Sequence, residues 1–170
     1  MSVAEKRRNE MVEEASAQYL TFSLGGEEYG VDILRVQEVK VWTEVTVLPN
    51  TPSYIKGVLN LRGVIVPIID LRARFAMEAV DYDETTVIVV LKLNFENRDR
   101  VIGLVVDSVS DVLDVTQSAI KPVSEFELDS RSEAITGVAS VNDKLVIMMD
   151  AARLLDASEM SNLEDEVIDT

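Results

Sequence analysis

The sequence predicts a mainly β protein made of two small β-barrels, each with about five short strands, packed around a shared hydrophobic seam. Short helices and a C-terminal helix are expected beside the strands. Apolar and polar residues alternate with a period of two in several short segments, and turn-forming residues separate these segments. Two groups of residues also recur 73 and 80 positions later in the chain. With 170 residues, the chain can bury a core without disulfide bonds.

The N-terminal part of the predicted fold begins with a β-hairpin. Residues 19–24 alternate between apolar and polar, a Gly-Gly pair at 25–26 provides a turn, and residues 29–33 form the second strand. Residues 34–39 are compatible with either a helical turn or a strand, whereas residues 45–48 predict a further strand.

A second hairpin is expected around Arg62 and Gly63, which separate the apolar runs 58–61 and 64–71. Gly63 can take a positive φ without steric cost, as tight hairpin turns require. Asp70 is a candidate N-cap for a short helix. The remaining elements are, in order, a strand at 86–93, a polar loop at 94–100, a strand at 101–106, a polar turn-like segment at 122–133, strands at 135–141 and 145–149, and a helical finish at 151–160.

The recurring residues predict that the fold is built from a duplicated unit. The pattern at 57–70 returns at 137–150, and the pattern at 30–39 returns at 103–112. The two offsets differ by only seven, as expected when a duplicated unit changes the lengths of its loops. The expected organisation is a flexible lead-in at 1–17, a first barrel at about 19–82, a second barrel at about 83–155, with strand exchange between them left open, and a helix end with an acidic tail at 156–170.

The composition excludes several kinds of chemistry. The chain has no Cys and no His, which rules out thiolate nucleophiles, Ser-His-Asp triads and the usual zinc ligands. Its formal net charge of -15 disfavours binding to nucleic acid and to anionic membranes. The spacing of Gly25 and Gly30 lacks the Lys and Ser/Thr of a P-loop, and the chain has no dinucleotide-binding glycine motif. We therefore expect no catalytic residue, no cofactor and no metal site.

Acidic clusters at 81–84 and 107–114 are interpreted as solvated surface. Two other functional classes remain as alternatives. A carboxylate-dependent hydrolase would need an enclosed acid pair with a raised pKa, and a small-ligand carrier would need a wide barrel interior. The N-terminal segment has no apolar core of a secretory signal, and the longest apolar runs, 64–69 and 87–91, are too short to cross a bilayer. The expectation is a soluble cytoplasmic protein.

Three residues are candidates for the recognition of a partner protein. Arg62, at the predicted hairpin tip, is either a solvated turn residue or a guanidinium presented to a carboxylate or to backbone carbonyls. Glu38 is flanked by apolar residues and is either simply exposed or part of a recognition patch. Trp42, the only Trp, is expected either in the core or as an interface anchor.

Three segments, at 28–39, 52–71 and 103–112, resemble the CheW-like family of bacterial chemotaxis coupling proteins. The most specific string is Gly-Val-x-Asn-Leu-Arg-Gly-x-x-x-Pro-x-x-Asp-Leu at 57–71. The resemblance runs from about Tyr19 to Leu155. A coupling protein fused to a receiver domain would need roughly another hundred residues, and a kinase fragment would carry ATP-binding or dimerisation segments that this chain lacks. The lead-in, the loop at 94–100 and the acidic tail depart from the family pattern.

The resemblance implies two SH3-like five-stranded barrels and a non-catalytic adaptor. Family members link the cytoplasmic hairpin tips of chemoreceptors (methyl-accepting chemotaxis proteins) to the regulatory domain of the histidine kinase CheA. They also take part in the rings that tie receptor arrays together, so further copies of the chain are candidate partners. The kinase domain is expected mainly on the second barrel, while the first barrel closes the ring. The receptor-binding positions of the family correspond here to Val36, Glu38, Gly57, Arg62 and Val105.

These positions suggest a specific receptor site. Val36 and Val105, one from each barrel, are expected to line an apolar strip that accepts a helix, with Glu38 and Arg62 at its rim. Arg62→His or Gly57→Asp is then expected to weaken receptor coupling while leaving the fold intact.

Overall fold

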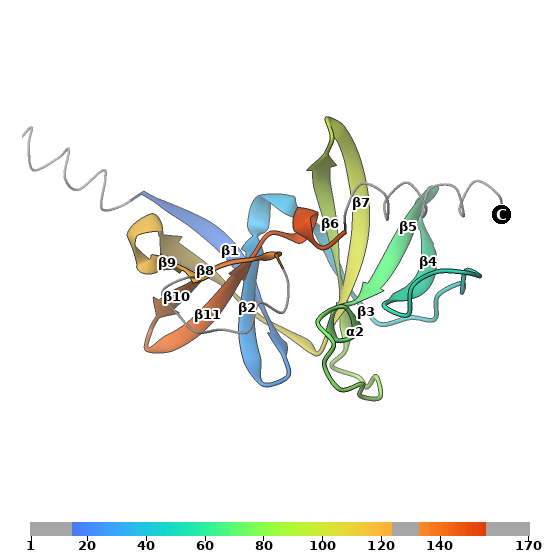
Figure 1. Ribbon diagram of the computed structural model, residues 1–170, viewed down its shortest axis with the longest axis horizontal. Helices are drawn as coiled ribbons and strands as arrows, with labels where there is room; N and C mark the ends of the chain where they lie inside the picture. Colours follow the sequence, from blue (N-terminus) through green and yellow to red (C-terminus); the bar gives the residue numbers. More distant parts are fainter. Residues whose placement is uncertain (1–14, 124–132, 156–170) are drawn as a thin grey trace, which may run out of the picture.

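The computed structural model describes residues 15–123 and 133–155. These residues form a mainly β structure with very short helical turns (Figure 1). The strands are β1 (Ser16–Leu24), β2 (Glu27–Asp32), β3 (Val36–Val41), β4 (Ile55–Leu61), β5 (Val64–Asp70), β6 (Val87–Phe95), β7 (Arg98–Val106), β8 (Ser108–Thr116), β9 (Ile120–Pro122), β10 (Ile135–Val141) and β11 (Lys144–Met149). The helical turns are η1 (Ile33–Arg35), α2 (Leu71–Arg74), η2 (Gln117–Ala119) and η4 (Ala151–Arg153).

The strands make two sheets, which confirms the mainly β, two-barrel fold class. One sheet has six strands in the order β8-β1-β2-β11-β10-β9, and the other has five in the order β3-β6-β7-β5-β4. We call them the terminal barrel, on the left in Figure 1, and the central barrel, on the right. In the central barrel, the chain after β3 crosses to the far edge of the sheet, where Thr46 bridges Val58.

The sheets divide the chain differently from the contiguous barrels expected at 19–82 and 83–155. The central barrel takes its strands from 36–106, and the terminal barrel takes them from 16–32 and 108–149. The hairpin β1–β2 joins β11, and the hairpin β6–β7 joins β5, in both cases through a parallel pair. A hairpin from each half therefore completes the sheet of the other half, so the halves exchange strands.

Irregularities in the strands show that the two halves are equivalent. β4 has a bulge between Ile55 and Gly57, and β10 has one between Ile135 and Gly137. The parallel pairs also match, since Gly30 lies opposite Met148 in one barrel and Gly103 lies opposite Ile68 in the other. Residues 30–39 thus correspond to 103–112, and residues 57–70 correspond to 137–150, as the recurring residues predict.

Several predicted elements need correction. Residues 45–48 form only the single bridge at Thr46, because the bulge at Gly57 interrupts the edge that they approach. The polar loop expected at 94–100 is a two-residue turn in which Glu96 and Asn97 both have positive φ, and the strands continue on either side. β8, at 108–116, was not predicted because its acidic residues obscure the alternation. β1 begins at Ser16, inside the expected lead-in.

Other local predictions are confirmed. The hairpins at β1–β2 and β4–β5 form, and residues 34–39 resolve into the end of η1 followed by β3. Asp70 caps α2 by accepting a hydrogen bond from the Ala73 amide at 3.2 Å. Of the C-terminal helix, only the short turn η4 lies within the described residues. The acidic tail and most of the segment 122–133 lie outside them.

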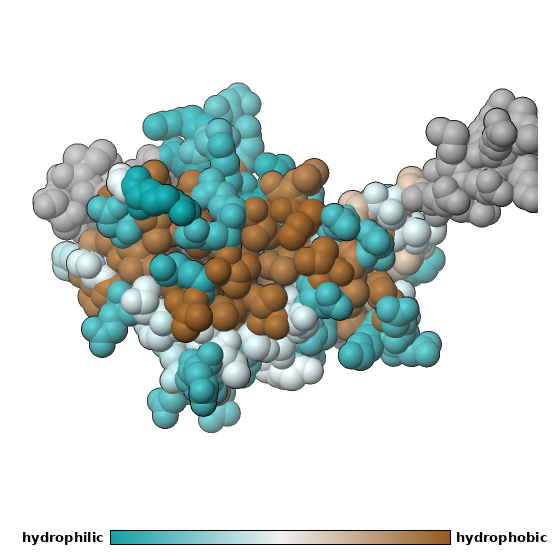
Figure 2. Space-filling model, turned by 180° about the vertical axis from the view of Figure 1, so that it is seen from behind, coloured by the Kyte–Doolittle hydropathy of each residue, from teal (hydrophilic) through white to brown (hydrophobic). Residues whose placement is uncertain are grey.

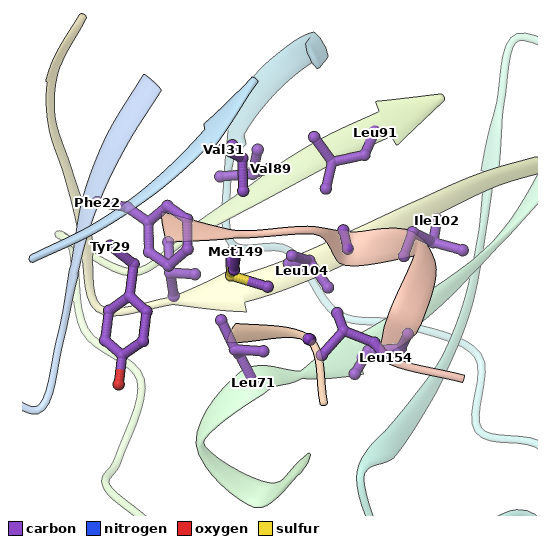
Figure 3. Close-up of a cluster of buried hydrophobic side chains, with 14 of the residues drawn as sticks. Phe22, Tyr29, Val31, Leu71, Val89, Leu91, Ile102, Leu104, Met149 and Leu154 are labelled. Atoms are coloured by element: carbon purple, nitrogen blue, oxygen red, sulfur yellow. The ribbon is translucent and has the colours of Figure 1, made fainter. Parts of the chain in front are cut away.

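The main hydrophobic cluster lies in the seam between the two barrels. Figure 3 shows its side chains converging from both sheets, with Phe22 at one end of the view, Leu104 near the middle and Ile102 at the other end. Neighbouring residues of β6 alternate, since Val89 and Leu91 enter the seam while Ile88 and Val90 enter a smaller cluster inside the central barrel. Both faces of this part of the strand are thus buried, which explains its apolar run at 87–91. Because the seam cluster has more buried apolar residues than the clusters inside the two barrels, it contributes the most hydrophobic stabilisation.

An ion pair between Arg72 and Asp107 links the two barrels. Arg72 on α2 donates two hydrogen bonds to Asp107, Nε to Oδ1 at 2.8 Å and Nη2 to Oδ2 at 2.7 Å. Asp107 also accepts the amide of Gly25, in the β1–β2 turn, at 2.9 Å. The hydrogen bonds from Arg72 hold the pKa of the Asp107 carboxyl below its ordinary value. One carboxylate therefore connects the terminal barrel to the helix of the central barrel.

Asp107→Asn is expected to lower the free energy of unfolding by about 1–2 kcal/mol at pH 7, because it removes a charge-assisted, bidentate contact. A carboxyl with a depressed pKa in the folded protein stabilises it above its unfolded pKa of about 3.9. That stabilisation is lost as the pH falls through the folded pKa, so the difference between variant and wild type should disappear in strong acid. Urea titrations at several pH values measure this. Asp99→Asn, which breaks only the exposed pair with Lys92, is the control and should change little.

Candidate partner-binding surface

Arg62 and Glu38 form an ion pair on the surface of the central barrel. Arg62 occupies the two-residue turn between β4 and β5, with φ values of 53° at Arg62 and 87° at Gly63. The Asn60 side chain accepts the Gly63 amide at 2.8 Å and fixes the turn. Arg62 Nη2 donates to Glu38 Oε2 at 2.6 Å, and the side chains are 78% and 28% exposed. Such an exposed pair contributes little to stability, so it can exchange partners at low cost.

Exposed apolar side chains adjoin this pair along the chain. They are Val39 (41% exposed) and Val41 (65%) on β3, and Val64 (51%) and Ile65 (41%) on β5. On the face opposite to that of Figure 1, hydrophobic surface spreads across the middle of the molecule (Figure 2). A protein-binding site usually combines apolar surface, which gives affinity, with charges that give specificity. The exposed apolar residues on β3 point to the opposite face of the strand from Glu38, so they widen the exposed surface of this edge rather than enclosing the pair.

The structure does not bring the other predicted site residues onto one strip. Val36 begins β3, is half-buried and packs against the seam cluster. Val105 is 3% exposed and belongs to the cluster inside the central barrel, so its side chain cannot line a surface strip. The reason is that β7 is a central strand buried on both faces, with Leu104 and Val106 facing the seam.

Gly57 is buried in the bulge of β4, with a φ of 151°. A Cβ atom at this position would lie 2.2 Å from the carbonyl oxygen of Thr46. The expectation that Gly57→Asp leaves the fold intact is therefore wrong, because even the first atom of any side chain clashes with backbone. Gly57 shapes the strand that carries Arg62 rather than presenting a contact of its own.

A cleft of about 290 Å³ lies where the two barrels meet, and sequence reasoning did not identify the residues that line it. Val31, Asp32 and Arg35 line it from β2 and η1. On the other sides lie Leu91 and Leu93 from β6, with Met149, Asp150 and Ala151 from β11 and η4. The only sequence feature that pointed to this cleft was the ambiguous segment at 34–39, where the helical turn η1 separates β2 from β3. Residues 35–38 lead from this cleft, through Val36, to the Arg62–Glu38 pair.

The acidic clusters contain no arrangement suited to catalysis. Asp83 accepts hydrogen bonds from the amide and hydroxyl of Thr85, which lower its pKa, and Asp107 is held by Arg72. Both shifts are opposite to the raised pKa that a general acid requires. Within residues 15–123 and 133–155, no three His, Cys, Asp or Glu residues are grouped as metal ligands.

Trp42 has a packing role in the central barrel. Its ring lies edge-on to that of Tyr82, with 4.4 Å between centroids, beside the cluster inside the central barrel. The Tyr82 hydroxyl donates to Asp70, and burial together with this hydrogen bond raises the pKa of Tyr82. Tyr82 therefore remains a neutral donor that ties the segment before β6 to the cap of α2.

The comparison with known proteins decides the family. A model of the CheW-like domain matches residues 18–159. The chain belongs to the CheW-like domain family. The chemotaxis protein CheW of Klebsiella aerogenes is 47% identical over 153 residues, covering 90% of each chain. A probable chemotaxis protein CheW of Rhizobium etli is 35% identical and covers 94% of this chain and 97% of its own.

A solved structure supports the same conclusion. The scaffolding protein TtCheW from Thermoanaerobacter tengcongensis has a TM-score of 0.74 and 30% identity, and the match covers 85% of this chain and 95% of that protein. This CheW-like chain is a chemotaxis adaptor and works without catalysis. In the part of the chain that the structure describes, no helix is long and apolar enough to span a membrane.

Proposed function

We propose that this chain couples the cytoplasmic tips of chemoreceptors to the regulatory domain of the histidine kinase CheA. It would act at the cytoplasmic face of receptor arrays, where copies of the chain and kinase domains form rings. Such a task requires at least two protein-binding surfaces held in a fixed relation. The large apolar seam supplies that rigidity, because it joins the barrels into one core.

The observation that carries the proposal is the Arg62–Glu38 pair, which a rigid turn presents on the surface, with exposed apolar residues next to it in sequence. A receptor tip is a helical hairpin with apolar residues near its turn, and such helices dock into apolar grooves. The cleft between the barrels offers a groove with both polar and apolar walls, and residues 35–38 connect it to the charged pair. Val36, half-buried between them, is the apolar contact that we assign to the receptor site. Gly57 and Val105 support this surface from within.

Charge reversal at position 62 tests the assignment. Arg62→Glu places two carboxylates opposite each other and should weaken binding to receptor fragments or kinase about tenfold or more, because it removes a charge-assisted contact and adds repulsion. Co-sedimentation with receptor-containing membranes and kinase, scored by kinase activation, measures the effect. Arg98→Glu, at the exposed start of β7, makes the same change in charge away from the site. Equal binding by wild type and Arg62→Glu would contradict the proposal.

A further inference from the structure

A second pocket lies on the terminal barrel, away from the cleft between the barrels. Its volume is about 160 Å³, enough for several water molecules. Glu28 from β2, Ser110 and Asp111 from β8, and Asn142 and Lys144 from the β10–β11 hairpin are among the residues that line it. We call it the Glu28 pocket. Its lining comes from β1, β2, β8, β10 and β11, which the barrel closure brings together.

The Glu28 carboxylate in this pocket is only half satisfied. Its Oε1 accepts the Ser110 hydroxyl at 3.0 Å, but its Oε2 is buried and has no hydrogen-bond partner. A buried carboxylate oxygen without a donor is costly, since burial removes its hydration. Lys144 is exposed and makes no ion pair among the described residues. Lys144 and Asn142 thus line the pocket, but neither donates to Glu28 Oε2.

The other half of the chain shows which group fits at this position. Asp111 corresponds to Glu38 at the 73-residue offset, and both follow the same strand bulge. Asn142 corresponds to Arg62 at the 80-residue offset, and both occupy the first position of a two-residue turn, with φ values of 52° and 53°. In the central barrel the site is filled by the Arg62 guanidinium on Glu38. In the terminal barrel the acid remains, Asn142 replaces the arginine, and a pocket is left.

A further difference strengthens this comparison. Glu28 corresponds to Val101 at the 73-residue offset, so the half that lacks the arginine carries an additional carboxylate. Two acids and an open volume face the position that a guanidinium fills in the other half. A guanidinium carries several N–H donors in a plane and matches carboxylates better than an ammonium does.

We propose that the Glu28 pocket binds a single arginine side chain presented by a partner protein. The guanidinium donates to Glu28 Oε2 and to the Asp111 carboxylate, and the aliphatic stem of the arginine packs on Val146 at the pocket wall. This proposal rests on the proposed adaptor function in one respect only: the arginine is assigned to a partner protein. It gives the terminal barrel a docking point equivalent to the one that Arg62 and Glu38 form on the central barrel.

A small probe tests the pocket on the purified chain alone. Backbone amide NMR spectra are recorded during titration with N-acetyl-L-arginine amide, and with the uncharged citrulline analogue as the comparison. Saturable shifts at Ser110, Asp111 and Lys144 with the arginine probe alone are expected. Glu28→Gln should weaken this binding about tenfold or more. Asp114→Asn removes the same charge from an exposed position of β8 outside the pocket and should leave binding unchanged.

Asn142→Arg provides the decisive variant. It places an arginine in the turn equivalent to that of Arg62, which has the same φ. The new side chain should fill the pocket and abolish binding of the probe. The NMR spectrum should remain that of a folded protein. Absence of saturable shifts, equal shifts with citrulline, or unchanged binding by either pocket variant would overturn the proposal. Because neither receptor nor kinase is present, such a result would leave the adaptor function untouched.

Discussion

Gly57→Ala is expected to lower the free energy of unfolding by about 3–5 kcal/mol, the largest effect that we expect from a single methyl group in this chain. The new Cβ would lie 2.2 Å from the Thr46 carbonyl oxygen and 2.7 Å from its carbonyl carbon. These are backbone atoms, held by two hydrogen bonds between Thr46 and Val58, so they cannot move aside cheaply. The φ of 151° adds a second cost, since side-chain-bearing residues rarely adopt it.

Urea unfolding followed by Trp42 fluorescence measures this loss. Gly63→Ala is a matched control, because Gly63 also has a positive φ, of 87°, but a Cβ there meets nothing within 4 Å. It should cost only about 1 kcal/mol for the backbone conformation. Similar losses at the two positions would show that the contact with Thr46 is unimportant.

This prediction changes how a defect at Gly57 should be understood. Gly57→Asp would reduce coupling by unfolding or distorting β4, which carries the Arg62 turn, rather than by removing a receptor contact. Variants at Arg62 change only an exposed side chain. They therefore separate recognition from folding, whereas variants at Gly57 do not.

Much of the local structure could be predicted from the sequence because its causes are local. Period-two alternation predicted the β1–β2 hairpin, and Arg62-Gly63 predicted the tight turn between β4 and β5. Asp70 was recognised as a cap because a side-chain oxygen at that position satisfies a free helical amide. The repeat was also visible, since the same bulges and turns require the same residues.

The relations between distant segments could not be predicted in the same way. Nothing in the alternation of β7 distinguishes Val105, inside the barrel, from its neighbours in the seam, because both faces of the strand are buried. Arg62 and Glu38 are 24 residues apart, and only barrel closure brings them into contact. The exchange of hairpins between the halves likewise depends on which strand edge is free to accept a hairpin. The sequence of a single hairpin carries no information about that edge.

Because the halves exchange hairpins, we expect the two barrels to unfold as one cooperative unit. Met148→Ala tests this expectation. Met148 is 2% exposed and belongs to the cluster inside the terminal barrel, whereas Trp42 packs in the central barrel. Truncating a buried Met should cost about 2–4 kcal/mol. The Trp42 fluorescence transition in urea should therefore move to lower denaturant by the full amount, together with the transition seen by far-ultraviolet circular dichroism.

The physical reason is that neither barrel can lose its structure alone. Melting the terminal barrel releases β1, β2 and β11, which removes Phe22 and Met149 from the seam and exposes the central barrel's Leu104. Leu145→Ala, on the same strand as Met148 but 63% exposed, should shift neither transition and serves as the control. Two separate transitions in Met148→Ala, with the Trp42 signal left at its wild-type midpoint, would mean that the barrels are independent. In that case the seam could not hold two partner-binding surfaces in a fixed relation.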